Sequence, residues 1–172
     1  MAFSVKGIAL GIGALYALGA LRNYQDRRNA LWVARQLASV SNKQSINIGA
    51  NCGGWLVPDF GDVKCDIRPK HGCVPCDILD LSQYQDKQFS VAFLSHVLEH
   101  VEEPEKALVE VERIADHVVV VLPVATDPSA FFHPDHKWMF FGGKRPVRQN
   151  TLFNFALLGT LGIVVYGFSK KR

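Results

Sequence analysis

The fold is decided by the stretch Ile46-Asn47-Ile48-Gly49-Ala50-Asn51-Cys52-Gly53-Gly54. It begins as a short apolar strand and continues directly into a turn of small residues. Glycine adds no Cβ and tolerates positive φ, so such a turn lets backbone N–H groups approach a ligand closely. A second apolar run ends at Asp66, where an acidic side chain is well placed to bind a ribose hydroxyl pair. The open alternative is an ordinary glycine-rich turn followed by a surface Asp66.

Apolar runs and helical patterns alternate through the middle of the chain. Strands are expected at 46–48, 63–66, 89–94 and 117–122, with a further apolar segment at 74–81. Helices are expected at 22–39 and at 104–114, where Pro104 suits the first helical turn. This alternation predicts an α/β fold with a doubly wound, mainly parallel sheet. Ligands bind beyond the carboxyl ends of the strands in such sheets. The residues expected there are Gly49–Gly53, Asp66, Asp77, Ser95 and His96.

Length and composition restrict the class of protein. A chain of 172 residues with 48% hydrophobic residues predicts one domain with appendages and a substantial core. The net charge is only +3, and most basic residues stand near the two ends. Basic residues that flank apolar runs favour a membrane surface over nucleic acid. Basic and aromatic residues are not interleaved as in proteins that stack bases, so no nucleic-acid partner is expected.

The segment from Phe3 to Leu21 is almost wholly apolar, with Lys6 as its only charge. It is long enough to cross a bilayer of about 30 Å if Lys6 extends toward the lipid headgroups. We therefore expect an N-terminal transmembrane helix over residues 1–22, with a secretory signal peptide or a buried soluble helix as alternatives. Arg22, Arg27 and Arg28 follow this segment and predict that the domain lies on the cytoplasmic side.

The C-terminal segment, residues 149–172, has two interpretations. It contains an uncharged run flanked by basic residues, which is long enough for a second transmembrane helix. Alternatively, Thr151–Gly159 forms the last helix and Gly162–Tyr166 the last strand of the sheet. The expected organisation is thus an N-terminal helix (1–22), an α/β domain (23–148) and this segment. Glycines in both apolar segments permit pairing in a homo-oligomer or with a membrane-complex partner.

Four cysteines lie in or beside the predicted strands, at Cys52, Cys65, Cys73 and Cys76. In an α/β pattern of this kind we interpret them as buried thiols in a reducing compartment. The alternative is a zinc-binding module at His71, Cys73 and Cys76. Structural zinc sites usually show two well-separated ligand pairs, so no metal is expected here.

Two histidine-containing motifs suggest other chemistry. The run His96-Val97-Leu98-Glu99-His100 matches H-x-x-E-H, the pattern of an inverted zinc protease. That motif requires both histidines one turn apart on a helix, whereas here they lie between a predicted strand and a predicted helix, so we discount it. The run His133-Pro134-Asp135-His136 stands in an aromatic-rich loop. It either lines a substrate pocket or contacts lipid, or it is a packed loop with surface histidines.

Between about Ser45 and Pro123 the chain resembles the class I S-adenosylmethionine-dependent methyltransferases, in particular the small-molecule branch related to the ubiquinone and sterol enzymes. The resemblance rests on the loop 47–53, on Asp66, on the segment 76–81 and on the region 89–114. Its most specific part is the run Leu98-Glu99-His100-Val101 with Pro104. Asn47 and Asn51 depart from the family pattern, since they replace an acid and a glycine of the first loop, and Ser90 replaces a common Asp. Few residues follow Pro123 to complete the sheet.

The resemblance implies a Rossmann-like methyltransferase fold with S-adenosylmethionine as cofactor. It implies that the cofactor is bound by Gly49, Ala50, Asn51, Gly53, Asp66, Ile67, Asp77, Ile78, Ser95 and His96. The candidates for a catalytic base are His96, His100 and His133. The expected function is a membrane-anchored methyltransferase that acts on a small or lipid-like acceptor, mainly by positioning the reactants and excluding water. The alternative is a catalytically inactive subunit of a membrane complex that keeps the fold.

Overall fold

The computed structural model describes residues 5–52, 59–70, 72–123, 130, 133–140 and 146–148. Gly53, His71 and residues 149–172, for which the sequence gives predictions, lie outside these described residues. The chain divides into two compact units. One is Tyr24–Leu122, and the other consists of Met1–Asn23 and Pro123–Arg172.

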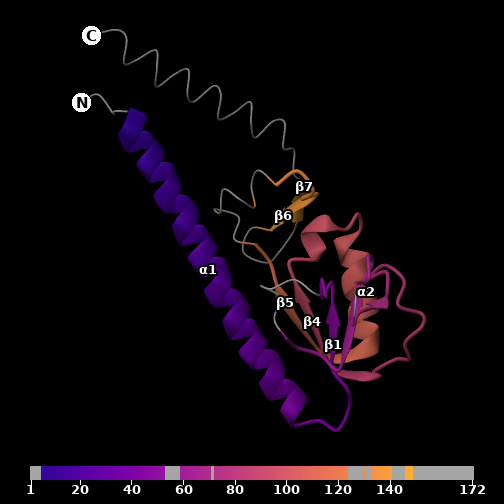
Figure 1. The fold of residues 1–172 in the computed structure, drawn as a ribbon. Coiled ribbons are helices and arrows are strands. Elements are labelled where there is room, and N and C mark those ends of the chain that lie inside the picture. The colour runs from indigo at the N-terminus through magenta and orange to yellow at the C-terminus, as the bar shows by residue number, and fades with distance from the viewer. Residues whose placement is uncertain are drawn as a thin grey trace. The chain divides into compact units, whose positions relative to one another are not determined.

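A parallel sheet of five strands forms the centre of the Tyr24–Leu122 unit (Figure 1). Its strands are β1 (Ile46–Ile48), β2 (Val63–Asp66), β3 (Val74–Pro75), β4 (Phe89–Ser95) and β5 (Ala115–Val121). Their order is β3-β2-β1-β4-β5, so the winding direction reverses between β1 and β4. The predicted parallel sheet is confirmed, and this reversal is the place where open parallel sheets bind their ligands.

One face of the sheet packs against the part of α1 (Val5–Ser39) that belongs to this unit. The core cluster there contains Ala34, Phe60, Val91, Phe93 and Val121. Val91 and Phe93 reach the same face because side chains alternate along a strand. The rings of Phe60 and Phe93 meet edge to face with centroids 5.5 Å apart. The amphipathic pattern of residues 22–39 thus correctly predicts a helix against the sheet.

The other face is covered by α2 (Pro104–Ile114), which lies across the sheet from α1 (Figure 1). Pro104 stands in the first turn of α2, as the sequence predicts. The helix buries Ala107, Val111 and Ile114. Helices on both faces of a parallel sheet fit the Rossmann-like methyltransferase fold.

α1 is one continuous helix from Val5 to Ser39. The sequence pattern predicts two helices that meet at Arg22, and this boundary is wrong. The polarity changes at Arg22 and Asn23, but neither residue interrupts a helix as proline or glycine does, so the backbone continues. Within the described residues, no helix combines the length and the apolarity that crossing a membrane requires.

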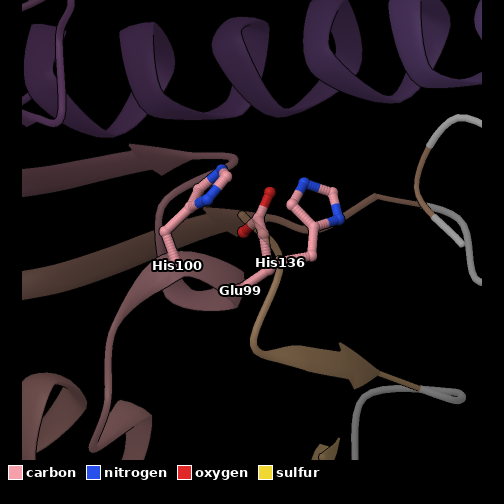
Figure 2. Close-up of side chains that lie close together, drawn as sticks. All are labelled: Glu99, His100 and His136. Atoms are coloured by element: carbon pink, nitrogen blue, oxygen red, sulfur yellow. The ribbon is translucent and has the colours of Figure 1, made fainter. Parts of the chain in front are cut away.

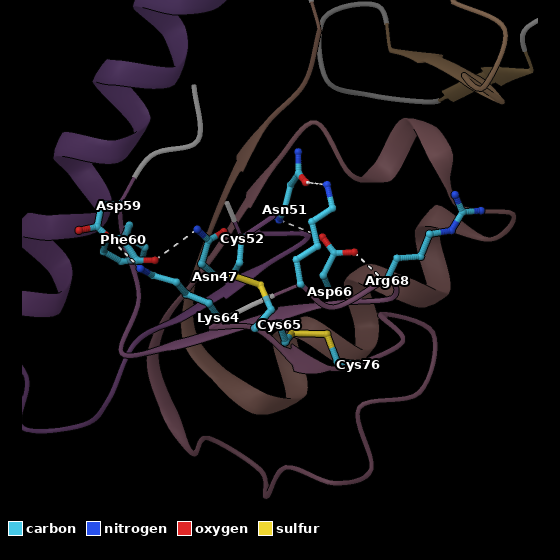
Figure 3. The surroundings of a disulfide bond; sticks show 12 residues. Asn47, Asn51, Cys52, Asp59, Phe60, Lys64, Cys65, Asp66, Arg68 and Cys76 are labelled. Carbon is cyan, nitrogen blue, oxygen red and sulfur yellow. Dashed lines mark hydrogen bonds and ion pairs between the residues drawn. A yellow bond between two sulfur atoms is a disulfide. The ribbon is translucent and has the colours of Figure 1, made fainter. Parts of the chain in front are cut away.

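The connections from β1 to β2 and from β2 to β3 contain no helix in their described residues. Disulfide bonds stabilise this region instead (Figure 3). Cys52 pairs with Cys73 and Cys65 pairs with Cys76, with Cα–Cα distances of 5.7 Å and 5.6 Å. The expectation of reduced thiols is therefore wrong, and neither Cys73 nor Cys76 remains a free ligand for the alternative zinc module. The bond between Cys65 and Cys76 can form because β3 pairs with β2. This pairing places Cys65 opposite Val74 and brings Cys76 close to it.

The second unit contains a hairpin of β6 (Trp138–Phe140) and β7 (Pro146–Arg148). The two strands pair antiparallel, with Met139 opposite Val147. The guanidinium carbon of Arg148 lies 5.8 Å from the centroid of the Trp138 ring, at cation–π distance. These two strands are not among those expected from the sequence.

Candidate functional site

The glycine-rich turn begins directly after β1, where Gly49 has a φ of 71°. The backbone N–H groups of Gly49 and Ala50 donate to the carbonyl oxygen of Cys65 at 2.9 and 3.1 Å. A Cβ atom on Gly49 would lie 2.4 Å from Cγ2 of Val97. Position 49 therefore requires glycine for two reasons, its left-handed backbone and its close contact with Val97. Asn51 also has positive φ, 41°, which asparagine tolerates better than most residues.

Asp66 ends β2 and connects it to this turn (Figure 3). Its Oδ2 accepts a hydrogen bond from the backbone N–H of Asn51, and its Oδ1 accepts one from the backbone N–H of Arg68, both at 2.9 Å. An ionised carboxylate offers about four lone-pair positions, so about two remain for other donors. Asp66 thus holds the turn in place and still has capacity for ligand hydroxyl groups.

Three further predicted residues follow Asp66 along the chain. The side chain of Ile67 is 70% exposed beside Asp66. Asp77 follows β3 and is exposed, and its Oδ1 accepts a hydrogen bond from the backbone N–H of Leu79 at 2.9 Å. Ile78 is buried, so its side chain is part of the hydrophobic core of the unit. Of these three side chains, Ile67 and Asp77 therefore offer surface at this end of the sheet.

β4 ends at Ser95, and the chain turns sharply at His96, whose φ is 58°. The backbone N–H of His96 donates to the carbonyl oxygen of Val121 at 2.9 Å, which ties this turn to the end of β5. The hydroxyl oxygen of Ser95 is buried and has no hydrogen-bond partner among the described residues. Non-glycine residues with positive φ are uncommon, and histidine is enriched among them. Ser95 and His96 thus stand where the sequence places them, at the carboxyl end of β4.

Glu99 lies at this site but is not among the site residues predicted from the sequence. It lies on the short 3-10 helix η1 (Leu98–His100), next to His100 (Figure 2). Its side chain is fully buried, and its Oε1 lies 3.5 Å from Nδ1 of His96. Burial raises the pKa of the Glu99 carboxyl to about 7, against the opposing effects of a hydrogen bond from its own backbone N–H and of the positive charge on Arg27. In turn, burial lowers the pKa of Arg27 on α1, which the charge of Glu99 partly offsets.

The three candidate bases do not all belong to the same unit. His96 and His100 belong to the unit with the five-stranded sheet, and the backbone N–H of His100 donates to the carbonyl oxygen of Val97 at 3.0 Å. His133 belongs to the other unit, where its ring stacks on that of His136 with centroids 4.4 Å apart. The backbone N–H of Asp135 donates to Nδ1 of His133 at 3.3 Å. His96 and His100 therefore share a unit with the strand ends that carry Gly49 and Asp66.

Comparison with known families adds one finding. Residues 62–117 match the family described as "Methyltransferase domain". The matched segment runs from the start of β2 into β5 and is about a third of the chain. It includes Asp66, Asp77, His96 and Glu99, whereas the glycine-rich turn precedes it. No match is found among curated proteins or among solved structures.

The match supports a relation to the class I S-adenosylmethionine-dependent methyltransferases, as the sequence resemblance implies. Proteins with this domain typically use S-adenosylmethionine. The five parallel strands with helices on both faces agree with this fold.

Proposed function

We propose that the protein is an S-adenosylmethionine-dependent methyltransferase that binds its cofactor along the carboxyl ends of β1 to β4. The observation that carries this proposal is the reversal of strand order between β1 and β4, with Gly49 and Asp66 on one side and His96 on the other. When bound, the cofactor supplies an electrophilic methyl group. The chain contributes binding, orientation and exclusion of water, which are the main sources of rate in a displacement of this kind.

The residues at these strand ends have the chemistry that this cofactor requires. In our proposal Asp66 accepts the ribose hydroxyl groups through its remaining lone pairs, and Ile67 and Asp77 lie beside the adenine ring. The positive φ of Gly49 and Asn51 folds the chain into a tight turn, which in our proposal lets the backbone lie close to the cofactor. The N–H groups of Gly49, Ala50 and Asn51 donate to Cys65 and Asp66 and hold this turn in shape. Support also comes from the family match, which covers β2, β3 and β4.

Asp66→Asn is expected to weaken the binding of S-adenosylmethionine and S-adenosylhomocysteine by about 10- to 100-fold. The variant loses a charged acceptor, and hydrogen bonds to charged groups contribute about 1.5–3 kcal/mol each. The measurement is isothermal titration calorimetry of the full-length protein, with thermal unfolding to establish that the variant folds.

Asp59→Asn is the matched control. Asp59 is a surface aspartate with 89% of its side chain exposed, and it pairs with Lys64 near the start of β2. Its replacement removes the same charge without touching the strand ends, so the affinity is expected to stay unchanged. Equal affinities of the native protein and Asp66→Asn would contradict this position of the cofactor.

We also propose that the first part of α1 attaches the enzyme to a lipid bilayer and that the methyl acceptor is lipid-like. Leu15, Leu18 and Leu21 support this, because each exposes more than half of its side chain on this helix. We expect the full-length protein to float with phosphatidylcholine vesicles in a density gradient, whereas a protein lacking residues 1–23 remains at the bottom. Recovery of both proteins in the same fractions would argue against attachment through this segment.

A second candidate function is a catalytically inactive subunit that keeps the fold and holds partners in a membrane complex. Asn47 favours it, because it replaces the usual acid of the family's first loop and has a structural role here. It is 2% exposed, and its Nδ2 donates to the carbonyl oxygen of Phe60 at 3.2 Å (Figure 3). The titration above separates the two functions: a folded native protein that binds neither form of the cofactor would favour the inactive subunit.

A further inference from the structure

A covalent bond holds the end of the glycine-rich turn that follows β1. Cys52, the last described residue of this turn, forms a disulfide with Cys73 in the loop between β2 and β3, which we call the turn disulfide. The neighbouring Asn51 is held through its backbone N–H by Oδ2 of Asp66, and its Oδ1 accepts a hydrogen bond from Nζ of Lys70 at 3.4 Å (Figure 3). Two adjacent residues thus join the turn to the segment that contains Asp66.

The two disulfides differ in their exposure to solvent. The bond between Cys65 and Cys76, which we call the strand disulfide, joins residues that are 0% and 8% exposed. In the turn disulfide Cys52 is also 8% exposed, whereas Cys73 is only partly buried. Thiol–disulfide exchange requires a thiolate to reach one sulfur of the bond, so its rate depends on access. A dissolved thiol is therefore expected to open the turn disulfide first, by attack on Cys73.

We propose that the turn disulfide is a redox-sensitive control of the cofactor site, so that the oxidised protein binds S-adenosylmethionine and reduction of this bond weakens binding. This inference rests on the proposed function and adds a regulation of the same site. The bond closes a loop that includes β2 and Asp66, which links the turn covalently to the residue that we propose for the ribose. Reduction removes this link and leaves hydrogen bonds to hold the turn.

The reduction is a two-electron exchange with a small-molecule thiol. Its thiolate attacks Sγ of Cys73 and forms a mixed disulfide, and the S–S bond breaks with its electron pair on Sγ of Cys52. A second thiolate attacks the small-molecule sulfur of the mixed disulfide and releases Cys73 in the same way. Two small-molecule thiols are thereby oxidised to one disulfide. The two protons that they lose pass to Cys52 and Cys73, so the protein gains two thiol groups.

Loss of the bond acts on Asn51, whose φ of 41° lies in the left-handed region. This conformation is uncommon for a residue with a side chain and persists where the surrounding contacts hold it. The turn disulfide fixes the next residue, Cys52, and so restricts the conformations open to Asn51. After reduction the turn populates other conformations, and the cofactor binds the fraction of molecules that keeps the native turn. If this fraction is about a tenth, the apparent affinity falls about 10-fold.

Limited reduction of the full-length protein tests this control. Glutathione buffers with graded ratios of thiol to disulfide open the accessible bond, and alkylation followed by mass spectrometry identifies the cysteines that have become free. We expect Cys52 and Cys73 to be modified at ratios that leave Cys65 and Cys76 paired and the circular dichroism spectrum unchanged. Calorimetric titration of this sample with S-adenosylhomocysteine should give a dissociation constant about 10-fold higher than that of the oxidised protein.

Cys73→Ser and Cys76→Ser are matched variants, because each removes one disulfide by a single change outside the glycine-rich turn and outside β2. Cys73→Ser should bind S-adenosylhomocysteine as weakly as the selectively reduced native protein and should not respond to the glutathione ratios that open the turn disulfide. Cys76→Ser keeps the turn disulfide and should bind as the oxidised native protein does. Mass spectrometry establishes that the remaining pair is intact in each variant.

Amide hydrogen exchange without any ligand tests the physical cause. Residues 49–52 should exchange about 10-fold faster in the selectively reduced protein than in the oxidised protein, because the turn opens more often. The strand β4 lies outside the closed loop and serves as the internal control, so its exchange should stay unchanged. Equal exchange of residues 49–52 in the two forms would overturn the inference even if Cys73→Ser fails to fold.

The outcomes separate this inference from the proposed function. Equal affinities of the oxidised and the selectively reduced native protein overturn this control and leave the proposed cofactor site standing. Opening of the strand disulfide before or together with the turn disulfide overturns it as well. Oxidised native protein that binds neither form of the cofactor overturns the proposed function, and this inference with it.

Discussion

Replacing Cys65 and Cys76 together with serine is expected to lower the free energy of unfolding by about 3 kcal/mol. The bond joins β2 to β3, an edge strand of only two residues that has few backbone hydrogen bonds of its own. Without the bond, the unfolded chain regains the freedom of the closed loop, and serine hydroxyls replace sulfur at positions that are at most 8% exposed. The measurement is urea unfolding followed by circular dichroism.

The second disulfide, between Cys52 and Cys73, closes a longer loop. Its removal is expected to lower the free energy of unfolding by a similar amount. The free energy lost with both bonds then approaches the free energy of unfolding of a small domain, about 5–15 kcal/mol. The four-serine variant should therefore be largely unfolded. Native protein treated with a dithiol reductant should behave like that variant. Identical unfolding curves with and without the reductant would show that these bonds do not hold the sheet together.

Stability is expected to fall by about 3 kcal/mol as the pH rises from about 5 to 8, because of Glu99. Its pKa is raised in the folded state to about 7, so the folded protein binds this proton more tightly than the unfolded chain does. The stabilising contribution is fully present below the unfolded pKa, and it is lost as the pH rises through the folded pKa. The free energy of unfolding from urea titrations across this pH range measures the effect.

Glu99→Gln removes the charge while keeping nearly the same shape, so its free energy of unfolding should show no corresponding fall over this range. It is therefore expected to be more stable than the native protein at about pH 8 and similar to it at about pH 5. Glu112→Gln should follow the native curve, because Glu112 is exposed. Parallel curves for the native protein and Glu99→Gln would mean that Glu99 titrates as an ordinary surface carboxyl.

Much of the fold could be predicted because its signals are local. The run Phe89–Ser95 is long enough to mark a buried strand, the glycine-rich turn marks the end of the short strand Ile46–Ile48, and Pro104 marks the start of α2. The continuity of α1 was missed because the change of polarity at Arg22 resembles a boundary, although nothing there breaks a helix. Hydrophobicity shows what a segment contacts, whereas only glycine, proline and caps show where its helix ends.

The site was predictable where a residue follows a strand directly, as Gly49, Asp66 and His96 do. The disulfides were missed because cysteine pairing depends on which strands become neighbours, and the α/β pattern suggested a reducing compartment. Glu99 belongs to the H-x-x-E-H run but is not among the predicted site residues, because the burial of a carboxylate depends on which elements pack around it. The available signal is its place between His96 and His100, directly after the buried Leu98, in the segment that most closely resembles the methyltransferases.

The paired cysteines also determine how the protein must be made. Four cysteines can join in three ways, and the structure contains the pairing of Cys65 with Cys76 and of Cys52 with Cys73. Formation of these bonds requires an oxidant, and correct pairing requires that wrongly paired cysteines can rearrange by thiol–disulfide exchange. For recombinant production, export with an oxidising foldase should yield uniform protein, whereas expression in a reducing host should yield scrambled or unfolded chains.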